Sequence, residues 1–184
     1  MIIFSYTQKD IFKGAQLIAS HKMKTLLAKA PEAIDDIVID ATDDEEILID
    51  YFKEGAGEII GKMSGYTKNL YEIDPVTLTY VLDPATGLPI LLDAITFVPA
   101  SVSPVVDASV VFRLNTPTTF KETILVSLDQ QIEKALKYFI LYHYYKNKGH
   151  DFETFFDDYS QSISKILFYL CQRTATITRS YKMF

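Results

Sequence analysis

The chain has 184 residues, 48% of them hydrophobic, and a net charge of −6 at pH 7. This length suits one domain with a sizeable core. The apolar content excludes a wholly disordered chain, the single cysteine excludes a disulfide scaffold, and the negative charge argues against a basic surface for nucleic acid covering the molecule.

The first predicted element is a helix over residues 8–30. Thr7 is an N-cap candidate, with Asp10 three residues later, and apolar residues then recur with a period near 3.6. Ser20-His21 is a candidate break, and a proline ends the helix. Residues 1–30 carry five lysines against one acid, so we expect them to form a basic N-terminal helical arm.

Residues 31–65 are predicted to hold an acidic-capped helix. Thr42 caps it and Glu45 completes a capping box. Asp43 and Asp44 occupy the first turn, where the helix dipole favours acids. An apolar stripe follows, made of Leu48, Phe52, Ala56, Ile59 and Met63.

Three glycines, Gly55, Gly57 and Gly61, lie inside this helix, and Gly65 is its expected stop. Each internal glycine costs about 0.5–1 kcal/mol against alanine, so we expect them to allow close approach of another backbone. Residues 31–60 carry eleven acids and one lysine. This acidic block is either a solvated face or a partner for the basic arm of a neighbouring copy.

Residues 66–126 hold six of the seven prolines, with β-branched and aromatic residues between them. They predict a β-rich insertion, either a small antiparallel sheet or a pair of long hairpins. A turn is expected at Pro84-Ala85-Thr86-Gly87, and we find no internal repeat. The expected strands lie near Val76–Leu82, Leu88–Val98, Ala108–Leu114 and Thr119–Val126.

Two long helices are predicted over residues 127–172. Ser127 caps the first, which is apolar nearly all round and ends at Gly149. The second runs over residues 152–172, and residues 173–184 form a tail that would order on a partner. We therefore predict an α+β, mainly helical fold: one domain over residues 1–184, a helical bundle with an inserted β-hairpin or small sheet and extended terminal arms.

Motifs for catalysis or metal binding are absent from the sequence: there is no phosphate-binding glycine loop, no HExxH and no cysteine pair. His143 and His150 could approach each other across the Gly149 turn, but a structural role is favoured over a metal site. Cys171 is expected to be a small core residue. Capping explains the acids at residues 43–46 better than calcium binding does. We expect no enzyme, no catalytic, cofactor-binding or metal-binding residue, and no cofactor.

Membrane and export signals are also absent. Polar residues follow almost directly after the short apolar start, Met1-Ile2-Ile3-Phe4. A signal peptide needs a basic start and a longer apolar run. The longest apolar stretches fall far short of the roughly 18 residues that span a bilayer.

Two helix patterns with a β-rich segment between them carry a family resemblance. The first comprises Ile37-Val38-Ile39-Asp40 and then, in order, Asp44, Ile47, Leu48, Phe52, Ala56, Ile59, Ile60, Ser64 and Gly65. The second comprises Ile132, Ala135 and Leu136, followed by His143-Tyr144-Tyr145-Lys146-Asn147-Lys148. Over roughly residues 34–149 the chain thus resembles the phage head–tail connectors, adaptor-ring proteins that dock beneath the portal. It departs from them in ending the second pattern on Lys148 instead of Arg, in its N-terminal helical region, in its longer proline-rich middle and in its long C-terminal helix and tail.

The resemblance implies a virion structural protein that forms a ring, with twelve copies expected to match the portal. The ring would join capsid to tail, contact the portal and other neck or tail proteins, and surround double-stranded DNA without reading its sequence. We expect it in the virion neck, and in the host cytoplasm during assembly. An acidic channel lining would let DNA slide; alternatively, the acids pair with the basic segment of the next subunit.

Two alternatives remain open: another phage neck or tail-completion protein, and a non-enzymatic helical binding module. A connector predicts large exposed apolar patches on the monomer. A binding module predicts a closed pocket of roughly 300–1,000 Å³, and an enzyme, the least favoured class, predicts convergent titratable groups in a cleft.

Overall fold

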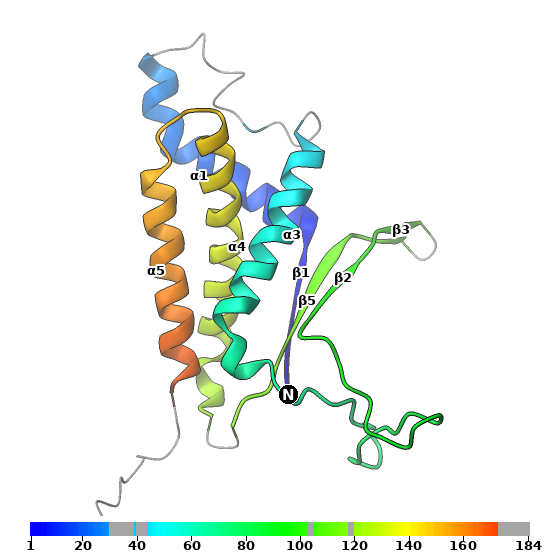
Figure 1. The fold of residues 1–184 in the computed structure, drawn as a ribbon. Helices are drawn as coiled ribbons and strands as arrows, with labels where there is room; N and C mark the ends of the chain where they lie inside the picture. The colour runs from blue at the N-terminus through cyan, green and yellow to red at the C-terminus, as the bar shows by residue number, and fades with distance from the viewer. Residues whose placement is uncertain (30–38, 40–43, 103–104, 118–119, 173–184) are drawn as a thin grey trace, which may run out of the picture.

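The computed structural model describes residues 1–29, 39, 44–102, 105–117 and 120–172, except for the side chains of residues 23 and 25–29. The fold is α+β and mainly helical, as predicted (Figure 1). In chain order the elements are β1 (Ile2–Thr7), α1 (Gln8–Lys29), α3 (Glu45–Lys62), η2 (Ser64–Tyr66), β2 (Ile95–Val98), β3 (Ser101–Val102), β4 (Val105–Val106), β5 (Ser109–Leu114), η3 (Glu122–Ile124), α4 (Leu125–Asn147) and α5 (Glu153–Leu170).

Helix α4 is the centre of the bundle, and α1, α3 and α5 all pack against it. Its apolar residues surround the helix axis, as the sequence pattern indicates, so it has buried positions toward each neighbour. The fully or nearly fully buried residues of α4 are Leu128, Ile132, Ala135, Leu136, Phe139, Ile140, Leu141, Tyr144 and Tyr145.

Strands β1, β5 and β2 form an antiparallel sheet in the order β1-β5-β2. Phe4 lies opposite Phe112 and Tyr6 opposite Val110. All four side chains are buried, whereas Ile3 faces solvent. This period-two alternation is that of a strand with one buried face.

The predicted N-terminal arm is therefore corrected. Residues 2–7 form strand β1. This strand and helix α1, which follows it, both belong to the core, to which they contribute Phe4, Tyr6, Ile11 and Phe12. A pattern of six residues is too short to identify a strand, and the pairing with β5 is what makes these residues one. Helix α1 is continuous through the expected break, where the hydroxyl of Ser20 donates to the Leu17 carbonyl.

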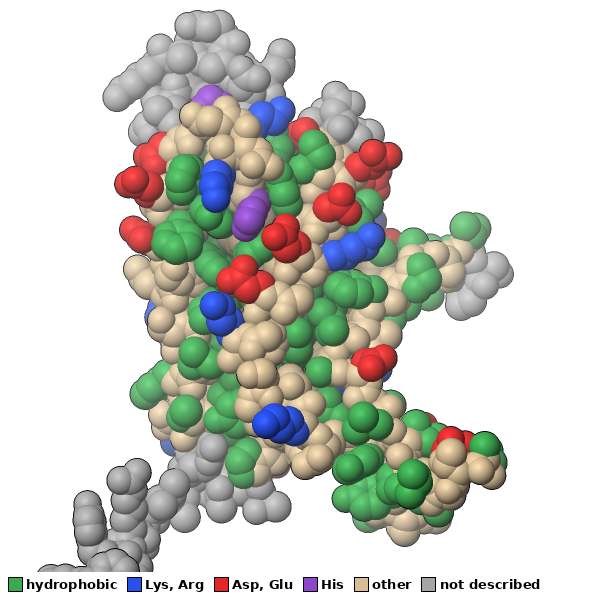
Figure 2. All heavy atoms as spheres, viewed as in Figure 1, with side chains coloured by type: hydrophobic (Ala, Val, Ile, Leu, Met, Phe, Trp, Pro, Cys, Tyr) green, Lys and Arg blue, Asp and Glu red, His purple; other side chains and the backbone are tan. Residues whose placement is uncertain are grey.

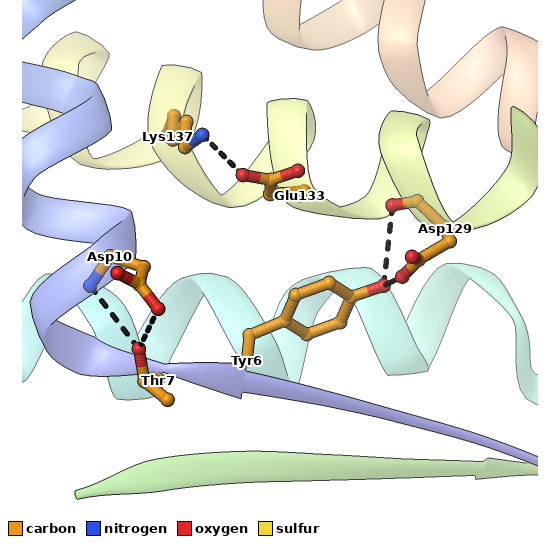
Figure 3. A network of polar contacts seen from close by, with 6 residues as sticks. All are labelled: Tyr6, Thr7, Asp10, Asp129, Glu133 and Lys137. Carbon is orange, nitrogen blue, oxygen red and sulfur yellow. Dashed lines mark hydrogen bonds and ion pairs between the residues drawn. The ribbon is translucent and has the colours of Figure 1, made fainter. Parts of the chain in front are cut away.

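Polar contacts fix the junction between β1 and the helices (Figure 3). Thr7 caps α1 as predicted: its Oγ1 accepts the Asp10 amide at 3.3 Å and donates to the Asp10 carboxylate at 2.6 Å. The Tyr6 hydroxyl donates to Asp129 Oδ1 of α4 at 2.6 Å. Burial, reinforced by this carboxylate, raises the pKa of Tyr6 far above its ordinary value.

The predicted helix starts need correction. Helix α3 begins at Glu45, so Asp44 is at the N-cap and makes no capping bond; instead its carboxylate accepts the Tyr144 hydroxyl at 2.7 Å. Thr42 lies outside the described residues. Helix α4 begins at Leu125 after the 3₁₀ turn η3, so Ser127 is not its cap. The strand predicted near Thr119–Val126 is wrong for the same reason.

None of the three glycines inside α3 allows the close backbone approach that was expected, although Gly55 makes room for a side chain. A Cβ on Gly55 would lie 2.7 Å from Cδ1 of Phe139, so the close neighbour is the buried ring of α4 and not a backbone. Gly57 and Gly61 have no such neighbour within 4 Å. Helix α3 ends at Lys62, before Gly65, and the short η2 turn follows.

Candidate interaction surfaces

A compact loop projects from the body between η2 and β2 (Figure 1). We call residues 70–92 the two-turn loop; its base is closed by the Leu92 amide, which donates to the Leu70 carbonyl at 2.7 Å. Residues 71–79 read YEIDPVTLT and residues 80–88 read YVLDPATGL. This nine-residue repeat corrects the expectation that the chain has none, and its Tyr, Asp, Pro and Thr positions were a signal that the sequence already held.

Each repeat makes the same turn around its aspartate. Asp74 Oδ1 accepts the Val76 amide at 2.7 Å, and Asp83 Oδ1 accepts the Ala85 amide at 2.9 Å. Such side-chain-to-backbone bonds are typical of Asx turns. The backbone amides hold the pKa of Asp74 and, with the Thr86 hydroxyl, that of Asp83 below the ordinary value.

Both turns end on a left-handed residue. Gly87 has φ +66°, which costs glycine little. At the equivalent place Leu78 has φ +56°, a conformation that is unfavourable for a leucine. In the second turn the residue type thus suits the left-handed backbone conformation better than in the first.

Three chain segments in the loop bond to one another in a cycle. The Val81 amide donates to Glu72 O at 2.9 Å, the Ile90 amide to Val81 O at 2.9 Å, and the Glu72 amide to Ile90 O at 3.0 Å. Isolated bridges replace the strand predicted near Val76–Leu82 and the first part of the one predicted near Leu88–Val98. Strand β2 remains from the second prediction, and β5 agrees with the third.

Apolar side chains of the two-turn loop face solvent. Val76 is 88% exposed, and Leu70 is the loop's single buried apolar side chain. Figure 2 shows these hydrophobic side chains gathered on the lower projection. The loop carries three acids and no basic residue. Its exposed large hydrophobic residues are Ile73, Val76, Leu78, Tyr80, Leu82, Leu88 and Leu91.

A second apolar projection is the β3–β4 hairpin, on the same side of the body as the loop (Figure 1). Val102 is 90% exposed and Val105 is 84% exposed. Phe97 of β2, at the root of the projection, is also exposed.

Helix α5 exposes three large apolar side chains among polar ones. α5 packs against α4 and more lightly against α3, and it lies on the side of the bundle opposite the two projections (Figure 1). Phe156, Leu167 and Phe168 are exposed on it. Cys171, just after α5, is exposed as well, so its expected core position is wrong.

Two hollows lie between α1, α3 and the residues that flank β2 and β5. The larger has a volume of about 620 Å³ and includes Lys9, Lys13, Glu45 and Asp107 among its lining residues. The smaller, of about 270 Å³, is lined mainly by apolar residues, including Phe52, Phe97 and Pro99. These hollows are the concave surfaces on which the binding-module alternative depends.

The histidines flagged in the sequence contact different aromatic rings. His143 lies 4.3 Å from Phe139 and 4.5 Å from Tyr142, ring centroid to ring centroid, and burial lowers its pKa. His150 lies 6.3 Å from Tyr145, and its Nε2 is buried without a hydrogen-bond partner. Within the described residues no three His, Cys, Asp or Glu side chains gather as a metal site would require.

The charged segments are placed differently from one another. The acids of α3, from Glu45 to Glu58, are exposed. On α1, Lys22 pairs with Asp158 of α5 in its own chain, and its ammonium lies 4.9 Å from the Phe155 ring centroid. A contact of the basic segment with an acidic neighbour stays a prediction.

None of the helices in the described ranges combines the length and apolarity needed to cross a membrane. Comparison of the chain with family models, with curated proteins and with solved structures found no match.

Proposed function

We propose that the protein is the ring-forming subunit of a phage head–tail connector. The ring would contact the portal on one side and other neck or tail proteins on the other, and DNA would pass through its centre. The exposed apolar side chains on two projections carry this proposal. A protein that acts as a monomer has little use for them, because contiguous exposed apolar surface promotes association.

The arrangement of these surfaces also supports a ring. A closed ring needs two different, complementary faces on each subunit. The two-turn loop and the β3–β4 hairpin project from one side of the bundle, and α5, with its exposed Phe156, Leu167 and Phe168, lies on the other (Figure 1). The exposed acids of α3 would suit a DNA channel, because like charge keeps phosphates from binding.

A phage neck or tail-completion protein is the nearest alternative, since it would also assemble through such surfaces. The binding-module alternative is favoured by a different observation, the hollow of about 620 Å³ between α1 and α3. Its lining includes both lysines and acids, so a zwitterionic or mixed polar–apolar ligand would suit it.

The test is the mass of the purified full-length protein by light scattering, together with negative-stain images, alone and mixed with a portal protein. We expect closed rings, either free or formed only on the portal. A monomer that remains monomeric and ignores the portal would contradict the proposal. Thermal stabilisation of that monomer in a small-molecule screen would then favour the binding module.

A further inference from the structure

We infer that the two-turn loop of one copy docks on the outward face of the C-terminal half of α5 in the next copy. This inference rests on the proposed function, since it names the lateral contact of the ring. The occupant of the α5 face is thus a second copy of this chain.

Apolar complementarity is the first argument. Seven large hydrophobic side chains of the loop are exposed, and the rest of the described chain covers none of them well. Leu167 and Phe168 present a smaller apolar surface next to the exposed Cys171. An aromatic side chain on a helix face is a typical anchor at the centre of an interface.

Charge complementarity is the second argument. The loop carries Glu72, Asp74 and Asp83 and no basic residue. Between Tyr159 and Leu170, α5 carries Lys165 and no acid. Opposite charges at the rim of a contact favour one register and one partner.

Position is the third argument. The loop projects at the same end of the bundle as the C-terminal end of α5, but on the opposite side (Figure 1). If a second copy lies beside the first with its helical bundle pointing in nearly the same direction, the loop of one copy and the C-terminal end of α5 of the other lie at the same level. A contact between unlike faces repeats from copy to copy and closes into a ring when the rotation permits.

The loop is also preorganised for docking. Its two Asx turns and its cycle of backbone hydrogen bonds join only residues of the loop itself. Docking would therefore cost less ordering entropy than it would for a flexible arm.

The first test is a matched pair of variants. Phe168→Asp places a charge on the proposed contact, and Leu17→Asp places one on an equally exposed apolar residue of α1; both side chains are 61% exposed. We expect Phe168→Asp to weaken ring formation by about tenfold or more, the range of an interface anchor. Leu17→Asp should assemble as the wild type does. Circular dichroism and the unfolding midpoint of each variant check that the fold is intact.

The second test uses the only cysteine as a probe. Val76→Cys adds a thiol at the most exposed apolar position of the loop, and a short thiol-to-thiol cross-linker is applied to the assembled protein. We expect a ladder of dimers, trimers and larger species on a denaturing gel, with the bond mapped by mass spectrometry between residues 76 and 171. Adding Cys171→Ser should abolish the ladder.

The outcomes separate the inference from the proposed function. Two results together would overturn the inference and leave the connector proposal standing. In the first, the Phe168→Asp variant forms rings as readily as the wild type; in the second, the Val76→Cys variant forms rings but gives no cross-link between residues 76 and 171. A ladder that stops at dimers would also overturn it, because that is the mark of a two-fold contact. A wild type that forms no assembly, alone or with a portal, would contradict the proposed function itself.

Discussion

The helical body and the two-turn loop hold their shapes by different means. In the body, α4 is surrounded by apolar neighbours, and its residues Leu136 and Ile140 are fully buried. In the loop, backbone and aspartate hydrogen bonds fix the chain, while most of its leucines face solvent. Burial dominates the first region and local turn chemistry the second. A hydrophobic sequence therefore does not by itself say whether a segment belongs to the core.

The largest effect that separates the two regions is expected from truncating one leucine in each. Leu136→Ala in α4 should lower the free energy of unfolding by about 2–5 kcal/mol, because it removes buried contacts and leaves a cavity. Leu88→Ala in the loop, where the side chain is 65% exposed, should change it by less than about 0.5 kcal/mol. Urea unfolding of the isolated monomer measures both, and equal losses would contradict the comparison.

Alkaline pH should weaken the body through its tyrosines. Burial raises the pKa of Tyr6 and Tyr159, helped by Asp129 and Glu58 respectively, and burial alone raises that of Tyr145 to about 12. Because the pKa of each of these tyrosines is higher in the folded state than in the unfolded state, its contribution to the free energy of unfolding is fully present below pH 10. This contribution falls as the pH rises above 10.

Each such tyrosine should remove about 1.4 kcal/mol of unfolding free energy per pH unit above pH 10, until its folded pKa is reached. Urea unfolding at a series of pH values gives the slope. Tyr159→Phe removes one titrating group and should make the slope shallower. An unchanged slope in that variant would show that other groups cause the loss.

Two glycines of α3 offer a smaller contrast within the body. Gly55→Ala would press a methyl group against the buried Phe139 ring, so we expect a loss of about 1–3 kcal/mol. Gly57→Ala has open space around it and should gain about 0.5–1 kcal/mol from helix propensity. Thermal or urea unfolding distinguishes the two. A gain at both positions would mean that α3 and α4 separate more easily than their packing indicates.

The left-handed residues of the loop should respond in opposite directions. Leu78→Gly removes an unfavourable conformation and should stabilise its turn by about 1 kcal/mol. Gly87→Ala forces a side chain into that conformation and should destabilise the other turn by a similar amount. Amide hydrogen exchange within residues 70–92 is the measurement, because local opening is independent of global unfolding. Equal exchange in both variants would contradict the assignment of the turns.

The smallest effect is expected in the loop at acid pH. The pKa of Asp74 and Asp83 is lowered, chiefly by the backbone amides that they accept. Their contribution to the stability of the two turns is therefore present above the ordinary aspartate pKa. It is lost as the pH falls through the lowered pKa values. An NMR titration of the Val76 and Ala85 amides should show midpoints below pH 3.8. Asp83→Asn keeps an acceptor without a titrating group and should abolish the Ala85 transition.

Helix prediction from the sequence worked where an apolar period ran for several turns. The spans of α1, α4 and α5 lie close to the predicted ones because each stripe is long. Their caps were less predictable. Asp44 accepts a hydrogen bond from Tyr144, a hundred residues away, instead of capping α3. Such a choice between local and distant partners depends on packing that the local sequence does not contain.

The β-rich middle was the least predictable region. Its residues have strand propensity, yet residues 71–91 form three isolated bridges and no strand. The repeated Asp-Pro-x-Thr pattern was the signal for two like turns, and strand propensity obscured it because β-branched residues also suit exposed turn flanks. Strand β1 was missed because six residues become a strand only where β5 is beside them.

By itself the sequence determined the α+β class, the approximate spans of α1, α4 and α5, the capped start of α1 and the nine-residue repeat, because these depend on neighbours within a few positions along the chain. Tertiary structure decided which apolar segments became core. It paired Tyr6 with Asp129, placed the Phe139 ring beside Gly55, and left the apolar side chains of the two-turn loop and of Phe168 exposed on opposite sides of the bundle. Burial depends on distant segments meeting in space, and no local pattern in a sequence records that meeting.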